Sequence, residues 1–210
     1  MDILKVLNLY SGIGGNRKLW EDVEVTAVEL NPKIAEIYQD FFPNDKVIVT
    51  DAHQYLLEHF KEYDFIWSSP PCPSHSRARF WGSHRDDTPE IYPDMALYQE
   101  ILFLRYFFKG LWVVENVIPY YTSLIPGKKI GRHLFWSNFY IPTIGTKDAD
   151  INRGNIKEWQ DLHGFDISKY KLNTRRDKVL RNCVQPNLGL HILNTARNIS
   201  VPIQEDLFAK

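Results

Sequence analysis

The stretch KVLNLYSGIGG, residues 5–15, joins a short apolar run to a loop that contains three glycines. An apolar run of this length that ends in glycines is typical of a buried strand followed by a tight turn. Glycines also leave the backbone bare, so that a ligand can approach it closely. The loop has neither the G-x-G-x-x-G spacing nor the lysine of a phosphate-binding loop. We therefore expect either a turn alone or a binding loop for a ligand other than a phosphate chain.

Outward from this loop, strand-like and helix-like segments alternate. Apolar runs at 25–30, 46–49, 64–69 and 110–117 predict further strands. Helical spacing is found at 31–42, where Asn31 is a plausible N-cap, at 51–60 after Asp51, and at 94–108, and a short helix is expected before Trp20. Strands that alternate with helices predict an α/β fold with a doubly wound, mostly parallel sheet.

The composition is that of a globular protein. Hydrophobic residues make up 44% of the 210 residues, which suits one domain that spans 1–210. The net charge of −1 argues against a protein that coats nucleic acid, but it allows local basic faces. Two widely separated cysteines favour a reducing compartment. The N-terminal residues do not resemble a signal peptide, and no apolar run is long enough to span a membrane. We expect a cytoplasmic protein without a membrane partner.

Polar residues follow each predicted strand. The glycine loop ends the first strand, Glu29 the second, Asp51 follows the third, 68–72 end the fourth, and Glu115 lies at the end of the fifth. In doubly wound sheets, ligands bind at the carboxyl ends of the strands. Glu29 is placed to accept hydrogen bonds from ribose hydroxyls, or it is a solvated or capping residue. Asp51 is placed to accept from an adenine amino group, or it only caps a helix.

Cys72 lies in the stretch WSSPPCPSHSRAR, residues 67–79. A lone cysteine is more often a packing residue than a nucleophile. Two prolines that stiffen the loop, and the position at the carboxyl edge of the sheet, favour the nucleophile here. Arg77 and Arg79 are candidates for the cations that would lower its pKa. Glu115, at the end of an apolar strand, could protonate a ring nitrogen of a pyrimidine or hold its exocyclic amine.

In this order and spacing, the motifs resemble those of the DNA cytosine-C5 methyltransferases. LNLYSGIGG resembles the family's cofactor loop, AVELNP the strand with the ribose-binding acid, and TDAHQY the adenine-contacting segment. SSPPCPSHS resembles the loop with the catalytic cysteine, and ENV the glutamate motif. RHLFWSNF resembles the arginine strand, EWQDLHGFD the leucine-x-glycine-phenylalanine segment, and LRNCVQPNLGLHIL the terminal asparagine-x-valine helix.

The resemblance implies the class I, Rossmann-like methyltransferase fold, with S-adenosyl-L-methionine as methyl donor and no metal. It implies catalysis by Cys72, Glu115 and Arg132, and double-stranded DNA as partner, with the target cytosine flipped out of the helix. Ser76, Arg77, Arg79 and Arg85 would contact the DNA. The implied cofactor-binding residues are Tyr10, Ser11, Gly12, Ile13, Gly15, Glu29, Leu30, Asp51, Ala52, Ser69, Pro71, Asn182 and Val184.

The chain departs from the family pattern in two places. The segment KIGRH offers only Arg132 where the family has an arginine pair, with Lys129 or His133 as stand-ins. Residues 140–155 are all that remains of the target-recognition region, so we expect relaxed sequence specificity or a separate specificity partner. Three alternatives stay open: an RNA cytosine-C5 methyltransferase, an amino-methyltransferase, and a non-catalytic relative that binds nucleic acid.

Overall fold

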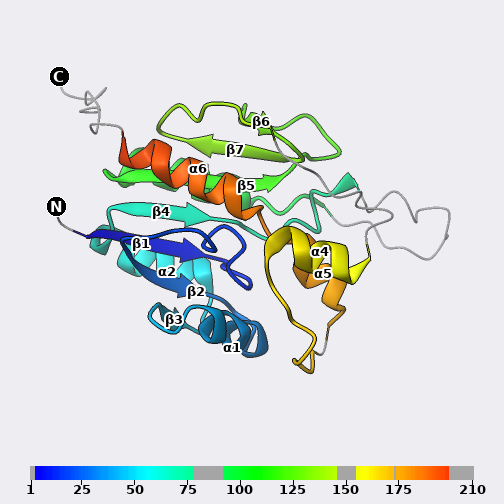
Figure 1. The fold of residues 1–210 in the computed structure, drawn as a ribbon. Helices are drawn as coiled ribbons and strands as arrows, with labels where there is room; N and C mark the ends of the chain where they lie inside the picture. The colour runs from blue at the N-terminus through cyan, green and yellow to red at the C-terminus, as the bar shows by residue number, and fades with distance from the viewer. Residues whose placement is uncertain (1–2, 78–91, 146–154, 173, 199–210) are drawn as a thin grey trace, which may run out of the picture.

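The computed structural model describes residues 3–77, 92–145, 155–172 and 174–198. Its centre is a seven-stranded sheet with the order β3-β2-β1-β4-β5-β7-β6 (Figure 1). The strands are β1 Leu4–Leu9, β2 Val23–Val28, β3 Lys46–Ile48, β4 Phe65–Ser68, β5 Leu111–Val117, β6 Lys128–Ile130 and β7 His133–Ser137.

Strand direction confirms the predicted sheet. Strands β1 to β5 are mutually parallel, whereas β7 runs antiparallel to both β5 and β6. The chain order reverses between β1 and β4, which are neighbours in the middle of the sheet. Such a switch in strand order leaves a crevice beyond the carboxyl ends of the two strands. The fold is therefore a doubly wound, mostly parallel α/β fold of the Rossmann-like kind, as the sequence predicted.

The helices begin where the sequence provides caps. Asn31 accepts a hydrogen bond from the backbone N–H of Lys33, and Asp51 accepts one from that of Gln54, so both predicted N-caps are confirmed. Gly164 ends α4 with a left-handed φ of 68°. The helices are α1 Pro32–Phe41, α2 Ala52–His59, a 3-10 turn Phe60–Glu62, α3 Ala96–Phe107, α4 Ile156–His163, α5 Arg176–Arg181 and α6 Pro186–Arg197.

Helices cover both faces of the sheet. Because side chains alternate along a strand, Val6 and Trp67 pack with α6 on one face, whereas Leu7 and Ile66 pack with α2 and α3 on the other. A third apolar cluster joins α1 to α4 and α5. In Figure 1, α6 lies in front of the sheet and α4 and α5 lie next to the tips of the central strands. The C-terminal segments are thereby placed at the sheet edge where the polar residues were predicted to meet.

The short helix expected before Trp20 is wrong. Successive turns take its place: the N–H of Gly14 donates to the carbonyl of Ser11, that of Arg17 to Gly14, and that of Trp20 to Arg17. Gly14 has a φ of 84°, in the left-handed region, which a right-handed helix cannot include. The loop therefore stays open along the edge of the sheet.

Part of the predicted sites lies outside the described residues. Arg79 and Arg85 fall in 78–91, and 146–154 of the predicted recognition segment 140–155 is likewise outside. Within the ranges that are described, no helix is long and apolar enough to cross a membrane. The same ranges contain no group of three or more His, Cys, Asp or Glu side chains that could hold a metal ion.

Candidate active site

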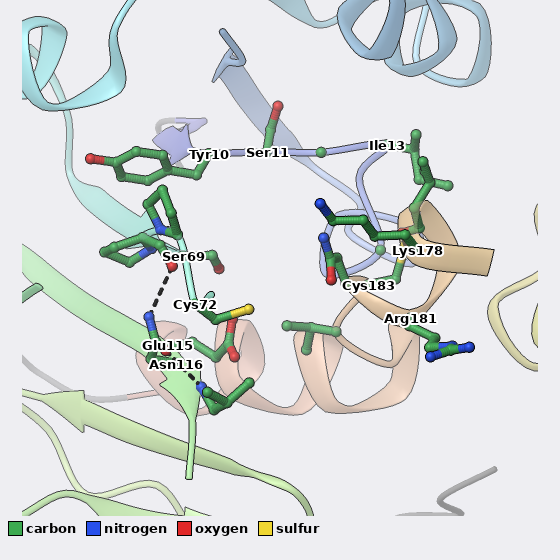
Figure 2. Close-up of a pocket in the computed structure, with 18 of the residues that line it drawn as sticks. Tyr10, Ser11, Ile13, Ser69, Cys72, Glu115, Asn116, Lys178, Arg181 and Cys183 are labelled. Atoms are coloured by element: carbon green, nitrogen blue, oxygen red, sulfur yellow. Dashed lines mark hydrogen bonds between the residues drawn. The ribbon is translucent and has the colours of Figure 1, made fainter. Parts of the chain in front are cut away.

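A pocket of about 1200 Å³ opens at the carboxyl edge of the sheet. Its lining includes every predicted cofactor-binding residue, the three predicted catalytic residues, and Ser76 and Arg77. The parallel direction of the central strands is the reason, because it brings the ends of β1, β2, β4 and β5 to one edge. Figure 2 shows Cys72 and Glu115 on one side of this pocket and Lys178 and Cys183 on the other.

The glycine loop and Glu29 are held together by backbone donors. The N–H of Gly12 donates to Glu29 Oε2 over 3.1 Å, and the N–H of Asn31 donates to Oε1 over 2.8 Å. Burial raises the pKa of Glu29, and these hydrogen bonds lower it. Each carboxylate oxygen keeps a second lone pair, so Glu29 can still accept from a hydroxyl group in the pocket.

Two C-terminal segments close tightly on the glycine loop. A Cβ atom on Gly15 would lie 2.6 Å from the Cβ of Cys183 and 2.7 Å from the carbonyl oxygen of Val184. A Cβ on Gly189 would overlap the backbone of Asn16. Side chains at these two glycines would push α6 and the segment before it away from the loop. The pocket is therefore built jointly by the start and the end of the chain.

The outer wall of the pocket matches a nucleoside. Leu30 lines it with 67% of its surface exposed, and Ala52 lies nearby in the same wall. Asp51 is exposed and lines the pocket as well, so its second oxygen remains accessible while the first caps α2. A flat aromatic base would cover the exposed apolar surface of Leu30, and Asp51 would accept from its amino group.

The cysteine loop is fixed at both ends. Asn116 donates from Nδ2 to the carbonyl oxygen of Pro70 over 2.9 Å (Figure 2). The backbone N–H groups of His75 and Ser76 both donate to the carbonyl of Cys72 over 3.0 Å. Trp67 donates from Nε1 to Ser69 Oγ over 2.9 Å. These bonds hold the Cys72 thiol, which is partly exposed, inside the pocket.

Electrostatics at Cys72 and Glu115 favour the protonated forms of both groups. Burial, and then the charge of Glu115, raise the pKa of Cys72, and the positive charges of Arg132 and Lys178 lower it. Arg77, which the sequence suggested as an activating cation, instead donates from Nε to the carbonyl of Pro119 over 3.1 Å. Burial raises the pKa of Glu115 to about 7. At neutral pH, Glu115 can therefore both hold and release a proton.

His133 lies next to Glu115. Its Nε2 is 3.4 Å from Glu115 Oε1, and both side chains are buried. Burial lowers the pKa of His133 to about 3, so the ring is neutral at pH 7 and the contact is not an ion pair there. The sequence had offered His133 only as a stand-in for a missing arginine.

Arg132 lines the pocket with its guanidinium turned toward the C-terminal segment. Its Nη2 donates to the carbonyl oxygens of Arg181, over 2.5 Å, and Cys183, over 3.3 Å. The guanidinium also lies over the ring of Trp159, 5.5 Å from its centroid. These contacts tie the turn between β6 and β7 to α4 and to the end of α5. A catalytic role for Arg132 stays a prediction.

Helix α5 adds cations that the sequence did not assign to the site. Arg175, Lys178 and Arg181 all line the pocket. The two arginines are ion-paired with Asp177, at 2.8 Å and 2.6 Å, whereas Lys178 extends into the pocket in Figure 2. The basic run at 169–181 was visible in the sequence. The sequence did not indicate that this run lines the same pocket as Cys72, which lies about a hundred positions earlier in the chain.

Comparison with known proteins agrees with this geometry. The model of the C-5 cytosine-specific DNA methylase family matches residues 4–96. The human tRNA (cytosine(38)-C(5))-methyltransferase is 33% identical over 93 residues, which cover 41% of this chain and 24% of the human protein. The Spodoptera frugiperda protein of the same name is 32% identical over 90 residues, or 40% of this chain and 26% of the relative.

Among solved structures, a mutant of Spodoptera frugiperda DNMT2 aligns at 31% identity and a TM-score of 0.39, over 54% of this chain and 35% of that one. The aligned part thus spans about a quarter of the length of the curated relatives. The range that the family model matches, 4–96, contains the glycine loop, Glu29, Asp51 and the cysteine loop. With these segments matched in order, residues 4–96 are similar to the C-5 cytosine-specific DNA methylase family.

Proposed function

We propose that this protein transfers a methyl group from S-adenosyl-L-methionine to C5 of a cytosine in DNA. The observation that carries the proposal is that Cys72 and a buried Glu115 share one pocket with the glycine loop and Glu29. A nucleophile and a proton donor are thereby combined with a nucleoside-binding edge. We expect the sequence specificity to be relaxed, because only a short segment, 138–155, separates β7 from α4.

The residues present fit this cofactor. At Gly12, Ile13 and Gly15, the backbone of the glycine loop lines the pocket, so the cofactor can approach it closely. Glu29 would accept hydrogen bonds from the ribose hydroxyls. Leu30 and Asp51 would hold the adenine, and Asn182 and Val184 would close the far side. When bound, the cofactor supplies a methyl group on a sulfonium centre, which departs as a neutral thioether once the methyl group is transferred.

Cytosine C5 is a weak nucleophile, and covalent attack by a cysteine makes it more reactive. The Cys72 thiolate would attack C6, which breaks the 5,6 double bond and makes C5 enamine-like. C5 then accepts the methyl group. A base removes the proton from C5, the 5,6 double bond forms again, and the Cys72 thiolate leaves. Cys72 is regenerated, so each cycle consumes one methyl donor and releases one proton.

Glu115 supplies the matching proton. A pKa of about 7 means that a large share of Glu115 is protonated at neutral pH. It would donate to the ring nitrogen N3 as the thiolate adds, which prevents negative charge from building up on the base, and it would take this proton back when the thiolate leaves. His133 is neutral and lies 3.4 Å away, so its nearby ring does not force Glu115 to ionise.

A buried Glu115 implies that the target base must enter the pocket as a single extruded nucleotide. Enzymes that act on a base in a duplex flip it out of the stack. The cations on the pocket wall, above all Lys178, would face the phosphates of that nucleotide, and such contacts position a strand without reading its sequence.

RNA is the second candidate substrate. The curated relatives described above are tRNA methyltransferases by name, which favours an RNA cytosine. The match covers only 41% of this chain and 24% of the human protein, which is too little to carry the substrate class over. The family model, in contrast, is that of DNA methylases, and it is the reason why DNA is placed first.

The test is a covalent trap. The protein is incubated with S-adenosyl-L-methionine and with matched duplex DNA or RNA that carries 5-fluorocytosine, and the products are weighed under denaturing conditions. Fluorine at C5 blocks the elimination step, so attack by Cys72 leaves a stable adduct. We expect an adduct with DNA that requires the cofactor and is lost in Cys72→Ser. An adduct with RNA alone would replace DNA by RNA, and no adduct with either would contradict the proposed reaction.

A further inference from the structure

The mechanism leaves one buried carboxylate unused. Glu100 lies on α3 and is completely buried, beneath the floor of the pocket rather than in its lining. Burying a carboxylate costs free energy unless hydrogen bonds and a counter-charge compensate for it. Its surroundings therefore indicate what the group does.

Both oxygens of Glu100 bind residues that begin pocket loops. Oε1 accepts a hydrogen bond from the Tyr10 hydroxyl over 2.5 Å, and Oε2 accepts one from Ser68 Oγ over 2.6 Å. Tyr10 is the first residue after β1 and opens the glycine loop. Ser68 ends β4 and is followed by the cysteine loop. One side chain thus holds the starting points of the two loops that would carry the cofactor and the nucleophile.

The backbone at Tyr10 needs such support. Tyr10 has a φ of 54°, a left-handed conformation that is unfavourable for a residue with a Cβ. Figure 2 shows its ring directed away from Cys72, Lys178 and Arg181, and its hydroxyl donates to Glu100. β1 and β4 are paired in register at Leu9 and Ser68, which fixes the two loop starts side by side.

A third contact of Glu100 comes from α2. His53 Nδ1 lies 3.1 Å from Glu100 Oε1, and this hydrogen bond raises the pKa of His53. Ala52, its neighbour, lines the pocket. Glu100 therefore connects the ends of β1 and β4 with the start of α2.

We propose that Glu100 is a positioning residue that sets the cofactor loop and the cysteine loop relative to each other. The inference rests on the proposed function for the names of the two loops, but the contacts do not depend on it. Loss of the Tyr10 contact would loosen the cofactor side, loss of the Ser68 contact would loosen the cysteine side, and loss of Glu100 would loosen both.

The experiment uses two measurements that need no nucleic acid. Binding of S-adenosylhomocysteine is measured by calorimetry, and the rate of iodoacetamide alkylation is measured against pH, with peptide mapping to identify the modified thiol. Burial raises the pKa of Cys183 to about 12, so alkylation of the folded protein reports Cys72. The variants are Tyr10→Phe, Ser68→Ala, Glu100→Met and Glu100→Gln.

We expect a split between the two contacts. Tyr10→Phe weakens binding by about tenfold and leaves alkylation near the wild-type rate. Ser68→Ala has the opposite pattern: the loosened loop exposes Cys72, the thiol pKa falls toward its ordinary value, and alkylation becomes about tenfold faster. Glu100→Met changes both, and Glu100→Gln, which keeps one acceptor oxygen, restores part of each.

The matched control is Tyr55→Phe, which removes a hydroxyl on α2 that lies 3.1 Å from the Tyr63 hydroxyl. We expect Tyr55→Phe to change neither cofactor binding nor alkylation, even if it lowers the melting temperature as much as Tyr10→Phe and Ser68→Ala do. If Glu100→Met fails to fold, the two single-contact variants decide the question. Wild-type values in both of them, or equal effects in Tyr55→Phe, would overturn the proposal. If the wild type binds no S-adenosylhomocysteine, the proposed function fails, while the Ser68→Ala alkylation rate still tests Glu100.

Discussion

Glu115 and His133 face each other at 3.4 Å from adjacent antiparallel strands, with a pKa of about 7 for the carboxyl group and about 3 for the ring. A histidine at this distance would usually be charged by its carboxylate partner. Here, burial keeps the ring neutral, and the carboxyl group is left free to titrate near pH 7. The pair is therefore a proton donor beside a neutral neighbour rather than a salt bridge.

The pH dependence of methyl transfer follows from this pair. In the proposed reaction, transfer needs a protonated Glu115 and a deprotonated Cys72, whose pKa is raised. Below a pH of about 7, Glu115 is already protonated and the rate falls about tenfold per pH unit as thiolate is lost. Between that pH and the thiol pKa, the two effects cancel. We expect a plateau in a plot of log(kcat/KM) against pH.

Glu115→Gln should remove the start of that plateau. The amide cannot donate a proton as the carboxyl group does, so the rate of methyl transfer should be about a hundredfold to ten-thousandfold below that of the wild type. In this variant, the rate should rise with pH up to the pKa of the Cys72 thiol, without a plateau. The variant also removes the negative charge that raises the pKa of Cys72. Alkylation of Cys72 at pH 8 should therefore become faster while methyl transfer becomes slower. A parallel loss of both rates would contradict this role for Glu115.

Cys72→Ser should separate chemistry from binding. Cys72 lies across the pocket from Cys183 and Lys178 (Figure 2), so calorimetry should give unchanged affinity for S-adenosylhomocysteine. Methyl transfer should fall by at least about a thousandfold. Unchanged transfer in this variant would exclude the covalent mechanism, whatever the substrate.

Lys178 should tune the reactivity of Cys72. Its positive charge lowers the pKa of the thiol from across the pocket. Because the lysine is exposed, solvent screens its effect, and Lys178→Gln should slow alkylation at pH 8 by only about two- to fivefold. Lys178→Arg keeps the charge and serves as the control. Equal rates in the glutamine and arginine variants would show that the charge has no part in activating the thiol.

Close packing at the glycine loop predicts a stability effect. In Gly15→Ala, the new Cβ meets Cys183 and Val184, so we expect a loss of about 1–3 kcal/mol in the free energy of unfolding and weaker cofactor binding. Gly145→Ala is the matched control, because a Cβ there has nothing within 4 Å. Urea titrations of both variants provide the measurement. Equal midpoints would mean that the C-terminal segment adjusts without cost.

Much of the site could be predicted from the sequence because parallel strands end at a common edge. Glu29, Asp51, Cys72 and Glu115 each follow a recognisable strand, so their meeting required only the fold class. The contacts of Arg132 with carbonyl groups near α5 depend on how the C-terminal segments return to the sheet, which no local pattern encodes.

Glu100 was missed for a related reason. It lies in an apolar helical stretch where one charged residue reads as solvent-exposed, and only the tertiary structure shows it to be buried. The turns in the glycine loop were missed because the polar and apolar pattern before Trp20 outweighed the left-handed glycines.

The contact of Gly15 with Cys183 and Val184 also has a consequence for biosynthesis. The two sides of the donor pocket are about 170 residues apart in the sequence, and contacts of such long separation form late in folding. While the chain is still emerging from the ribosome, the half that carries the family's glycine and cysteine motifs has no wall against which to hold a donor. Cys72 is therefore synthesised before Cys183 and Val184, and this wall of the pocket cannot form until those two residues have been added.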